Sequence, residues 1–140
     1  MPTFSDSSEV YKYIGGIFEQ ATSDPQLGEQ FAASGVVLQL HYSDPDAVVT
    51  VDMPGHKVYS GTDGLPADLK PTVEMFMKSD VAHRFWLGKV NISAALSKGD
   101  MRAKGPIPKI LQLVPMAQQL FPRYEKMLRE SGRDDLASIA

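Results

Sequence analysis

The side chains that could do acid–base or metal chemistry are few and far apart. Of the three histidines, we place His41 on a strand, His56 at a turn or strand start, and His83 on a helix. A metal site needs ligands that converge, and no nearby carboxylate pattern completes one beside any of them. We therefore expect surface or hydrogen-bonded histidines. His83 is the strongest exception, because it precedes Phe85 and Trp86 on an amphipathic helix.

Paired carboxylates occur at Asp44 and Asp46 and again at Asp134 and Asp135. Such a pair can do acid–base work only where one member is desolvated, whereas turn aspartates usually bond their own backbone. The sequence also lacks the Gly-x-Ser-x-Gly, His-Glu-x-x-His, Gly-x-x-x-x-Gly-Lys and Gly-x-Gly-x-x-Gly patterns. We therefore expect no enzyme, no catalytic residue, no cofactor and no metal.

Methionine is the more suggestive residue type, with seven in the chain. Its thioether is flexible and polarisable, so it suits either a cavity for ligands of variable shape or the filling of gaps in a core. The sequence leaves both readings open. Five methionines fall on strands or a helix start expected to enclose the core: Met53, Met75, Met77, Met101 and Met116.

The first elements to position these residues are two helices. Asp6 and Glu9 form a capping-box pattern, and apolar residues then recur at helical spacing, which predicts a helix over residues 7–23. A second, shorter helix begins after Asp24 and ends at Gly35.

The apolar period then changes from 3.6 to 2, which is typical of half-buried strands. Alternation predicts strands at 36–42 and 47–53, and a third strand around 56–60 completes a meander. Residues 61–71, rich in glycine and proline, form a connecting loop before another strand at 72–78.

Two short helices and a last strand follow. Asp80 is expected to cap a helix that ends at Gly88. Asn91 is expected to cap another that ends at Gly99, and residues 100–105 form the strand. The order of helices and strands predicts an α+β fold.

The tail is a helical segment with regularly spaced prolines. A proline inside a helix removes a hydrogen bond, so residues 106–132 should be broken or kinked near Pro115 and Pro122. The last eight residues are polar and small, and we expect them to be frayed.

Composition limits the class of protein. A chain of 140 residues is the size of one domain, so we expect a single domain over 1–140. A net charge of −3 and no run of basic residues argue against nucleic acid as a partner. The absence of cysteine fits a reducing compartment, and neither a signal peptide nor a membrane span is expected, so the cytoplasm is the default location.

A series of short motifs runs in order through residues 79–124. The motifs are Asp80-Val81-Ala82, Phe85-Trp86-Leu87-Gly88-Lys89, Ala94-Ala95-Leu96, Lys98-Gly99-Asp100-Met101, Lys104-Gly105-Pro106, Leu111-x-Leu113-x-Pro115 and Pro122-x-Tyr124. Together they resemble the sterol carrier protein type 2 domain. The resemblance implies an α+β fold with a five-stranded mixed sheet covered by helices on one face. It also implies an apolar tunnel between the sheet and the helices that takes sterols, fatty acids or fatty acyl thioesters, with no catalytic residues. The C-terminal Ala-Ser-Ile-Ala differs from the peroxisomal Ser-Lys-Leu address, so a peroxisomal location is not expected.

Three hypotheses remain at this stage. The leading one is a non-catalytic carrier of a lipid or sterol-like molecule. The second is a protein-interaction or homodimerisation module with a filled core and no lipid cargo. The third is an enzyme of lipid metabolism with His83 or His41 as base. The residues expected to line or border the cavity of the carrier are Val73, Met75, Met77, Phe85, Trp86, Met101, Leu113, Met116 and Leu120.

Overall fold

The N-terminal helical segment runs as the sequence predicts. The computed structural model describes residues 4–138. Helix α1 (Ser7–Val10), the π-helix η1 (Tyr11–Gly15) and α2 (Gly16–Ser23) follow one another without a break. The Asp6 carboxylate accepts a hydrogen bond from the Glu9 backbone N–H at 3.2 Å and caps the segment.

A second helix, α3 (Leu27–Ser34), turns the chain toward the sheet. The Asp24 carboxylate accepts hydrogen bonds from the backbone N–H groups of Gln26 and Leu27, both at 2.9 Å. Gly35 ends the helix with a φ of 69°, a left-handed conformation that glycine adopts without steric cost.

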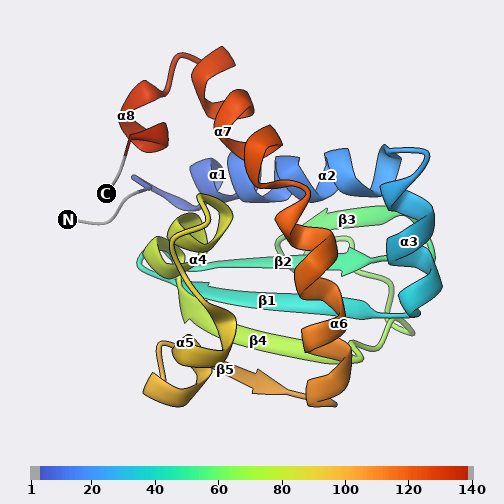
Figure 1. Cartoon of the computed structure of the whole chain (residues 1–140). Coiled ribbons are helices and arrows are strands. Elements are labelled where there is room, and N and C mark those ends of the chain that lie inside the picture. Colours follow the sequence, from blue (N-terminus) through green and yellow to red (C-terminus); the bar gives the residue numbers. More distant parts are fainter. Residues whose placement is uncertain (1–3, 139–140) are drawn as a thin grey trace.

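The five strands form one mixed sheet with the order β3-β2-β1-β4-β5 (Figure 1). β1 and β4 lie side by side in parallel, and every other neighbouring pair is antiparallel. The predicted strands and fold class are therefore confirmed. The strand bounds are β1 (Val37–Ser43), β2 (Ala47–Asp52), β3 (Lys57–Ser60), β4 (Val73–Lys78) and β5 (Met101–Lys104).

Alternating residues of the strands point into one core. Leu38, Leu40 and Tyr42 of β1 are buried, and Val73 and Met75 of β4 are buried beside them. Because side chains alternate between the two faces of a strand, these residues share the inner face of the sheet. The period-two pattern had predicted the strand, and the structure shows which of its faces points inward.

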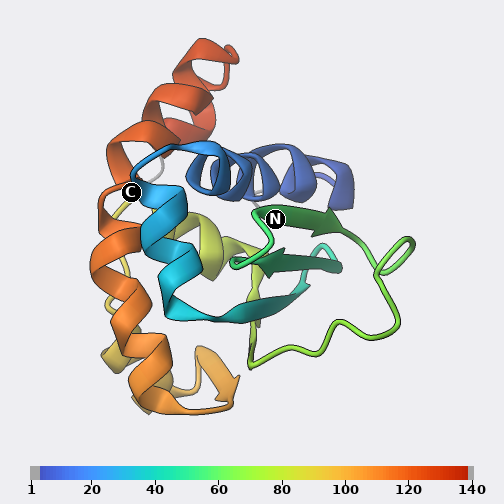
Figure 2. The same cartoon turned by 90° about the vertical axis from the view of Figure 1, so that its right-hand side faces the viewer.

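The helices α4 (Ser79–Trp86), α5 (Ile92–Lys98) and α6 (Ile107–Gln118) follow the later strands. Figure 2 shows α3 and α6 on one side of the sheet, while the loop of residues 61–71 extends on the other side. Helices thus cover one face, as expected.

Of the two predicted helix caps, the cap of α5 is confirmed and that of α4 is not. Asn91 caps α5 by accepting a hydrogen bond from the Ala94 N–H at 3.0 Å, and Gly99 ends it, as predicted. The prediction for Asp80 was wrong. β4 leads directly into α4, whose N-cap residue is Lys78, so Asp80 lies in the first turn of the helix.

The tail is interrupted at one place rather than two. Helix α6 continues through Pro115, which lies inside it. The chain then leaves helical hydrogen bonding around Leu120, and α7 (Phe121–Glu130) begins with Pro122 in its first turn. A proline is tolerated there because the N–H groups of a first turn have no partner within the helix.

The expectation of a frayed C-terminus was wrong for the described part of it. Residues 134–137 form α8 (Asp134–Ala137), in which Leu136 is 2% exposed. Arg133 ties this segment down through ion pairs with Glu9 of α1 and with Asp135, the latter at 3.1 Å. Residues 139 and 140 lie outside the described residues.

No helix within residues 4–138 combines the length and apolar character needed to cross a bilayer.

Candidate ligand cavity

An apolar cavity of about 70 Å³ lies between the inner face of the sheet and the helices that cover it. Its walls come from every layer of the fold, because helices, strands and connecting segments all contribute side chains. The lining residues are Phe18, Phe31, Leu38, Leu40, Tyr42, Met53, Val73, Met75, Met77, Ala82, Phe85, Trp86, Ile92, Met101, Ile110, Leu113, Val114 and Ala117.

The lining carries no charged side chain, and its only side-chain oxygen and nitrogen atoms are the Tyr42 hydroxyl and the Trp86 indole nitrogen. Tyr42 is 6% exposed, and burial raises the pKa of its hydroxyl well above the ordinary value. The hydroxyl therefore stays neutral. An anion would lose its hydration here without gaining a counter-charge, so the interior suits an apolar group with at most a neutral polar atom.

Seven of the nine residues predicted to line the cavity do so: Val73, Met75, Met77, Phe85, Trp86, Met101 and Leu113. Met116 and Leu120 are buried, at 9% and 0% exposure, but lie outside the lining. The reason is helix rotation. Ile110, Leu113 and Ala117 share the side of α6 that faces the cavity, and Met116 lies on its neighbouring flank. Whether the seven contact a ligand remains a prediction.

Sequence reasoning missed the contribution of β1 and of the N-terminal helices. In the parallel pair, Leu40 lies beside Met75 and Tyr42 beside Met77, so β1 and β4 present one continuous wall. The alternation of β1 was a usable signal for that wall. Phe18 and Phe31 carry no such signal, because the position of a helix over the cavity depends on tertiary packing.

The cavity is small compared with the usual pockets for small molecules. Pockets for small molecules usually enclose roughly 300–1,000 Å³, so about 70 Å³ leaves room only for a short group. Four of its lining residues are methionines, whose unbranched side chains change rotamer easily: Met53, Met75, Met77 and Met101. A long apolar ligand would require these side chains to move aside.

Three lining residues of the cavity are only partly buried. Most of its lining residues are buried, but Met77, Ile92 and Val114 are half-buried. Ile92 lies in the first turn of α5 and Val114 lies in α6. We call the place where these two residues meet the solvent the mouth of the cavity.

His83 is completely buried, but it is not part of the cavity lining. Its Nε2 lies 2.9 Å from the Leu136 carbonyl oxygen and its Nδ1 lies 2.7 Å from the Tyr124 hydroxyl. A carbonyl can only accept, so Nε2–H donates to Leu136 and the neutral Nδ1 accepts from Tyr124. Burial lowers the pKa of this imidazole, which favours that neutral form. His83 therefore connects elements of the fold.

The other two histidines also lie away from the cavity. His41 projects from the outer face of the sheet, where its Nε2 lies 3.1 Å from a Glu74 carboxylate oxygen and its ring stacks on Phe76. The His56 Nδ1 donates to the Thr22 carbonyl oxygen over 2.9 Å. Across residues 4–138, no cluster of His, Asp and Glu side chains has the geometry of a metal site.

Comparison with known proteins rests on structure. No protein-family model matches the sequence. No curated protein matches it either. Among solved structures, sterol carrier protein domain 2 of Helicoverpa armigera shares 15% identity and a TM-score of 0.63 over 81% of this chain and 89% of that one. Sterol carrier protein-2 like-3 of Aedes aegypti shares 13% identity and a TM-score of 0.63 over 79% of this chain and 98% of that one.

A third neighbour, sterol carrier protein-2 of Aedes aegypti, was solved as a complex with the C16 fatty acid palmitate. It shares 18% identity and a TM-score of 0.52 over 79% of this chain and 93% of that one. All three are α+β sterol carrier domains. The chain described here has the sterol carrier protein 2 fold, as the motifs of residues 79–124 had indicated.

Proposed function

We propose that this protein binds an apolar ligand in the cavity and carries or presents it without catalysing a reaction. The ligand classes proposed are a sterol, a fatty acid or a fatty acyl thioester, held by one lipid-binding domain over residues 1–140. The observation that carries the proposal is the lining, which is apolar apart from two neutral polar atoms. Palmitate in the third neighbour supports a fatty acyl chain as one such ligand.

A ligand would bind by taking up space that lining side chains, chiefly the methionines, occupy in this structure. Each buried methylene of the ligand contributes about 0.8 kcal/mol, less the cost of ordering the ligand and of moving the methionines. A neutral hydroxyl, ester or thioester oxygen could accept a hydrogen bond from Tyr42. A carboxylate would remain at the mouth, near solvent, because the interior offers it no cation.

The second candidate function is the protein-interaction or homodimerisation module. The observation in its favour is the cavity volume of about 70 Å³, which leaves the core nearly filled. The two functions differ in what the purified protein should contain and in whether its mass depends on concentration.

Native mass spectrometry of the gently purified protein, followed by organic extraction, tests the proposal. A carrier should show an added mass at near-equal stoichiometry, identified as a lipid in the extract. If no lipid is extracted, none binds on titration, and light scattering shows a concentration-dependent mass, the interaction module replaces the carrier.

A further inference from the structure

The charges of this chain are strongly segregated along the sequence. Residues 81–124 contain seven Lys or Arg residues and a single acidic residue, Asp100. The rest of the chain contains seven Lys or Arg residues and sixteen Asp or Glu residues. The overall net charge of −3 therefore conceals a basic part and a much more acidic part.

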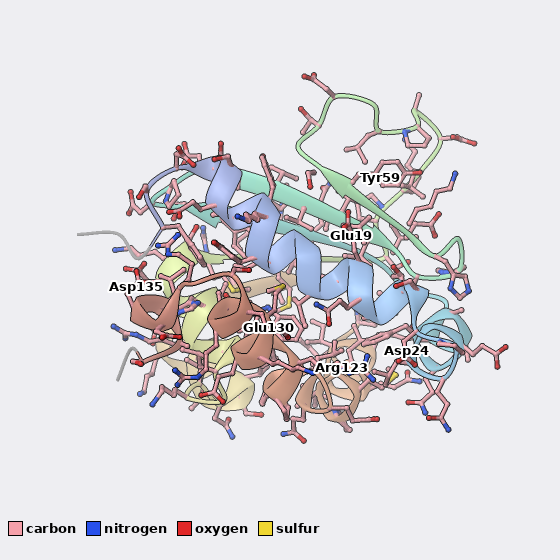
Figure 3. The ribbon with its side chains drawn as sticks, turned by 90° about the horizontal axis from the view of Figure 1, so that it is seen from above. Glu19, Asp24, Tyr59, Arg123, Glu130 and Asp135 are labelled. Atoms are coloured by element: carbon pink, nitrogen blue, oxygen red, sulfur yellow. The ribbon has the colours of Figure 1, made fainter. Side chains whose placement is uncertain are left out.

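The fold gathers most of the basic side chains of segment 81–124 at one end of the molecule. Helix α5, strand β5 and the start of α6 lie together at this end, opposite α2, α7 and α8 (Figures 1 and 2). This end carries Lys98, Arg102, Lys104 and Lys109 against one acidic residue, Asp100. The opposite end carries charges of both signs. Figure 3 labels Glu19, Asp24, Arg123, Glu130 and Asp135 there, and α7 also holds Lys126 and Arg129.

The basic end also carries the exposed apolar side chains. Ile107 and Leu111 are 47% and 45% exposed and are the exposed large hydrophobic residues within residues 4–138. They are four positions apart on α6, and Val114 follows three positions later, so the three form one stripe along the helix. Val114 lines the cavity at its mouth. The stripe therefore leads from solvent to the mouth.

We propose that α5 and the stripe side of α6 dock on the surface of an anionic phospholipid bilayer. Ile107 and Leu111 insert between the lipid head groups. The exposed Lys89, which precedes α5, and Lys98, its last residue, lie near the anionic groups. This inference rests on the proposed function, because docking in this orientation places the cavity mouth at the bilayer from which a ligand would enter.

Charge and size favour a bilayer over a protein partner. A stable protein interface buries roughly 800 Å² per partner around an apolar centre, whereas a bilayer surface can be engaged by a few apolar side chains and a group of cations. The α2 and α7 end carries both signs of charge, so an anionic surface attracts the basic end more strongly and turns it toward the lipid.

The test is flotation of the full chain with vesicles of phosphatidylcholine alone or of phosphatidylcholine with phosphatidylglycerol. We expect binding to the anionic vesicles only, weakening as salt is raised because the charges are exposed. The Lys89→Glu/Lys98→Glu variant should bind at least about tenfold more weakly, since each basic residue near an anionic membrane contributes about a fivefold factor. Ile107→Gln/Leu111→Gln should also lose about tenfold through lost apolar burial.

The matched control is Lys70→Glu/Lys126→Glu, which makes the same charge change at two exposed positions outside segment 81–124. It should bind anionic vesicles nearly as well as the unmodified protein. Equal losses in the two charge variants would overturn the proposal, because net charge alone would then explain binding. Failure of the unmodified protein to bind anionic vesicles would also overturn it.

Two further readouts separate this inference from its alternatives. Uptake of a fatty acyl probe from free solution should be unchanged in the Ile107→Gln/Leu111→Gln variant. Normal uptake without vesicle docking overturns this inference alone, whereas absent uptake overturns the proposed function. If light scattering shows a dimer that this variant converts to monomer, the stripe binds a second copy of the chain and the bilayer proposal is wrong.

Discussion

The imidazole Nδ1 of His83 lies 2.7 Å from the hydroxyl of Tyr124, so a fully buried hydrogen bond joins α4 to α7. The second ring nitrogen donates to the Leu136 carbonyl oxygen of α8 at 2.9 Å. One neutral side chain thus connects α4 to the two C-terminal helices, and Phe4 packs against the same ring with its centroid 5.2 Å away.

Stability should depend on pH through His83. Burial lowers the folded-state pKa of His83 below the ordinary value of 6.5, although the nearby carboxylates of Asp80 and Asp135 oppose that effect and Arg84 adds to it. The unfolded state therefore binds more protons in this range, and the stabilisation is present above pH 6.5 and lost as the pH falls toward the folded-state pKa. Urea unfolding should show the free-energy difference between the unmodified protein and His83→Gln shrinking below pH 6.5. A difference independent of pH would contradict the assignment.

Tyr124→Phe should destabilise the fold. The variant keeps the buried ring but removes the hydroxyl that donates to His83, leaving a buried acceptor unsatisfied. The expected cost is about 1–3 kcal/mol of unfolding free energy, measured by chemical denaturation. Tyr59→Phe on β3, a half-buried tyrosine, is the control and should cost less than about 0.5 kcal/mol.

Trp86 should report on the cavity. Its indole is 4% exposed, lines the cavity and packs edge-on against Phe18 and Phe121. Its emission should be that of a buried indole and should change saturably on titration with a long-chain fatty acyl ligand. Trp86→Ala should cost about 3–5 kcal/mol of stability, while Trp86→Phe should cost less and weaken ligand binding with the fold kept. Emission typical of a water-exposed indole would show that the helix is wrongly placed.

Tyr42→Phe should separate ligands by their polar group. If the Tyr42 hydroxyl bonds a neutral oxygen of the ligand, its loss should weaken binding of a fatty alcohol or ester by roughly tenfold. A hydrocarbon of the same chain length should bind both forms alike. Displacement of a fluorescent fatty acyl probe measures both affinities, and equal losses for both ligands would mean that Tyr42 acts only through packing.

The segment of residues 106–124 should open more easily than the sheet. Pro115 removes a hydrogen bond inside α6, and the helical ladder is interrupted before α7. Hydrogen exchange should show its amides less protected than those of the strands and more protected once a fatty acyl ligand is added. The absence of any ligand-dependent change would rule out a gating role for this segment.

The strands and the fold class could be predicted because a strand with one buried face has apolar residues at every second position, such as Leu38, Leu40 and Tyr42. The sequence of the C-terminal α8 has no comparable pattern. One apolar residue, Leu136, holds a short polar segment through contacts with distant parts of the chain, and no local pattern encodes them.

The strand pattern placed Val73 and Met75 on one face of β4, and the structure shows that this face lines the cavity. On α6 the prediction included both Leu113 and Met116, but only Leu113 lines the cavity, because the rotation of a helix about its axis is set by its neighbours. Phe31 was not predicted because its contact with the cavity depends on how α3 docks.

The parallel pairing of β1 with β4 determines when, during synthesis and folding, a ligand can first be held. Leu38 pairs with Val73 across a long stretch of chain, and the lining extends to Ala117 on α6. Such non-local pairing forms slowly, and a nascent chain that ends before α6 has no closed cavity to fill. If the cavity takes a ligand as proposed, loading follows synthesis of the chain through α6. A ligand that binds only the completed cavity should then raise the midpoint of global unfolding.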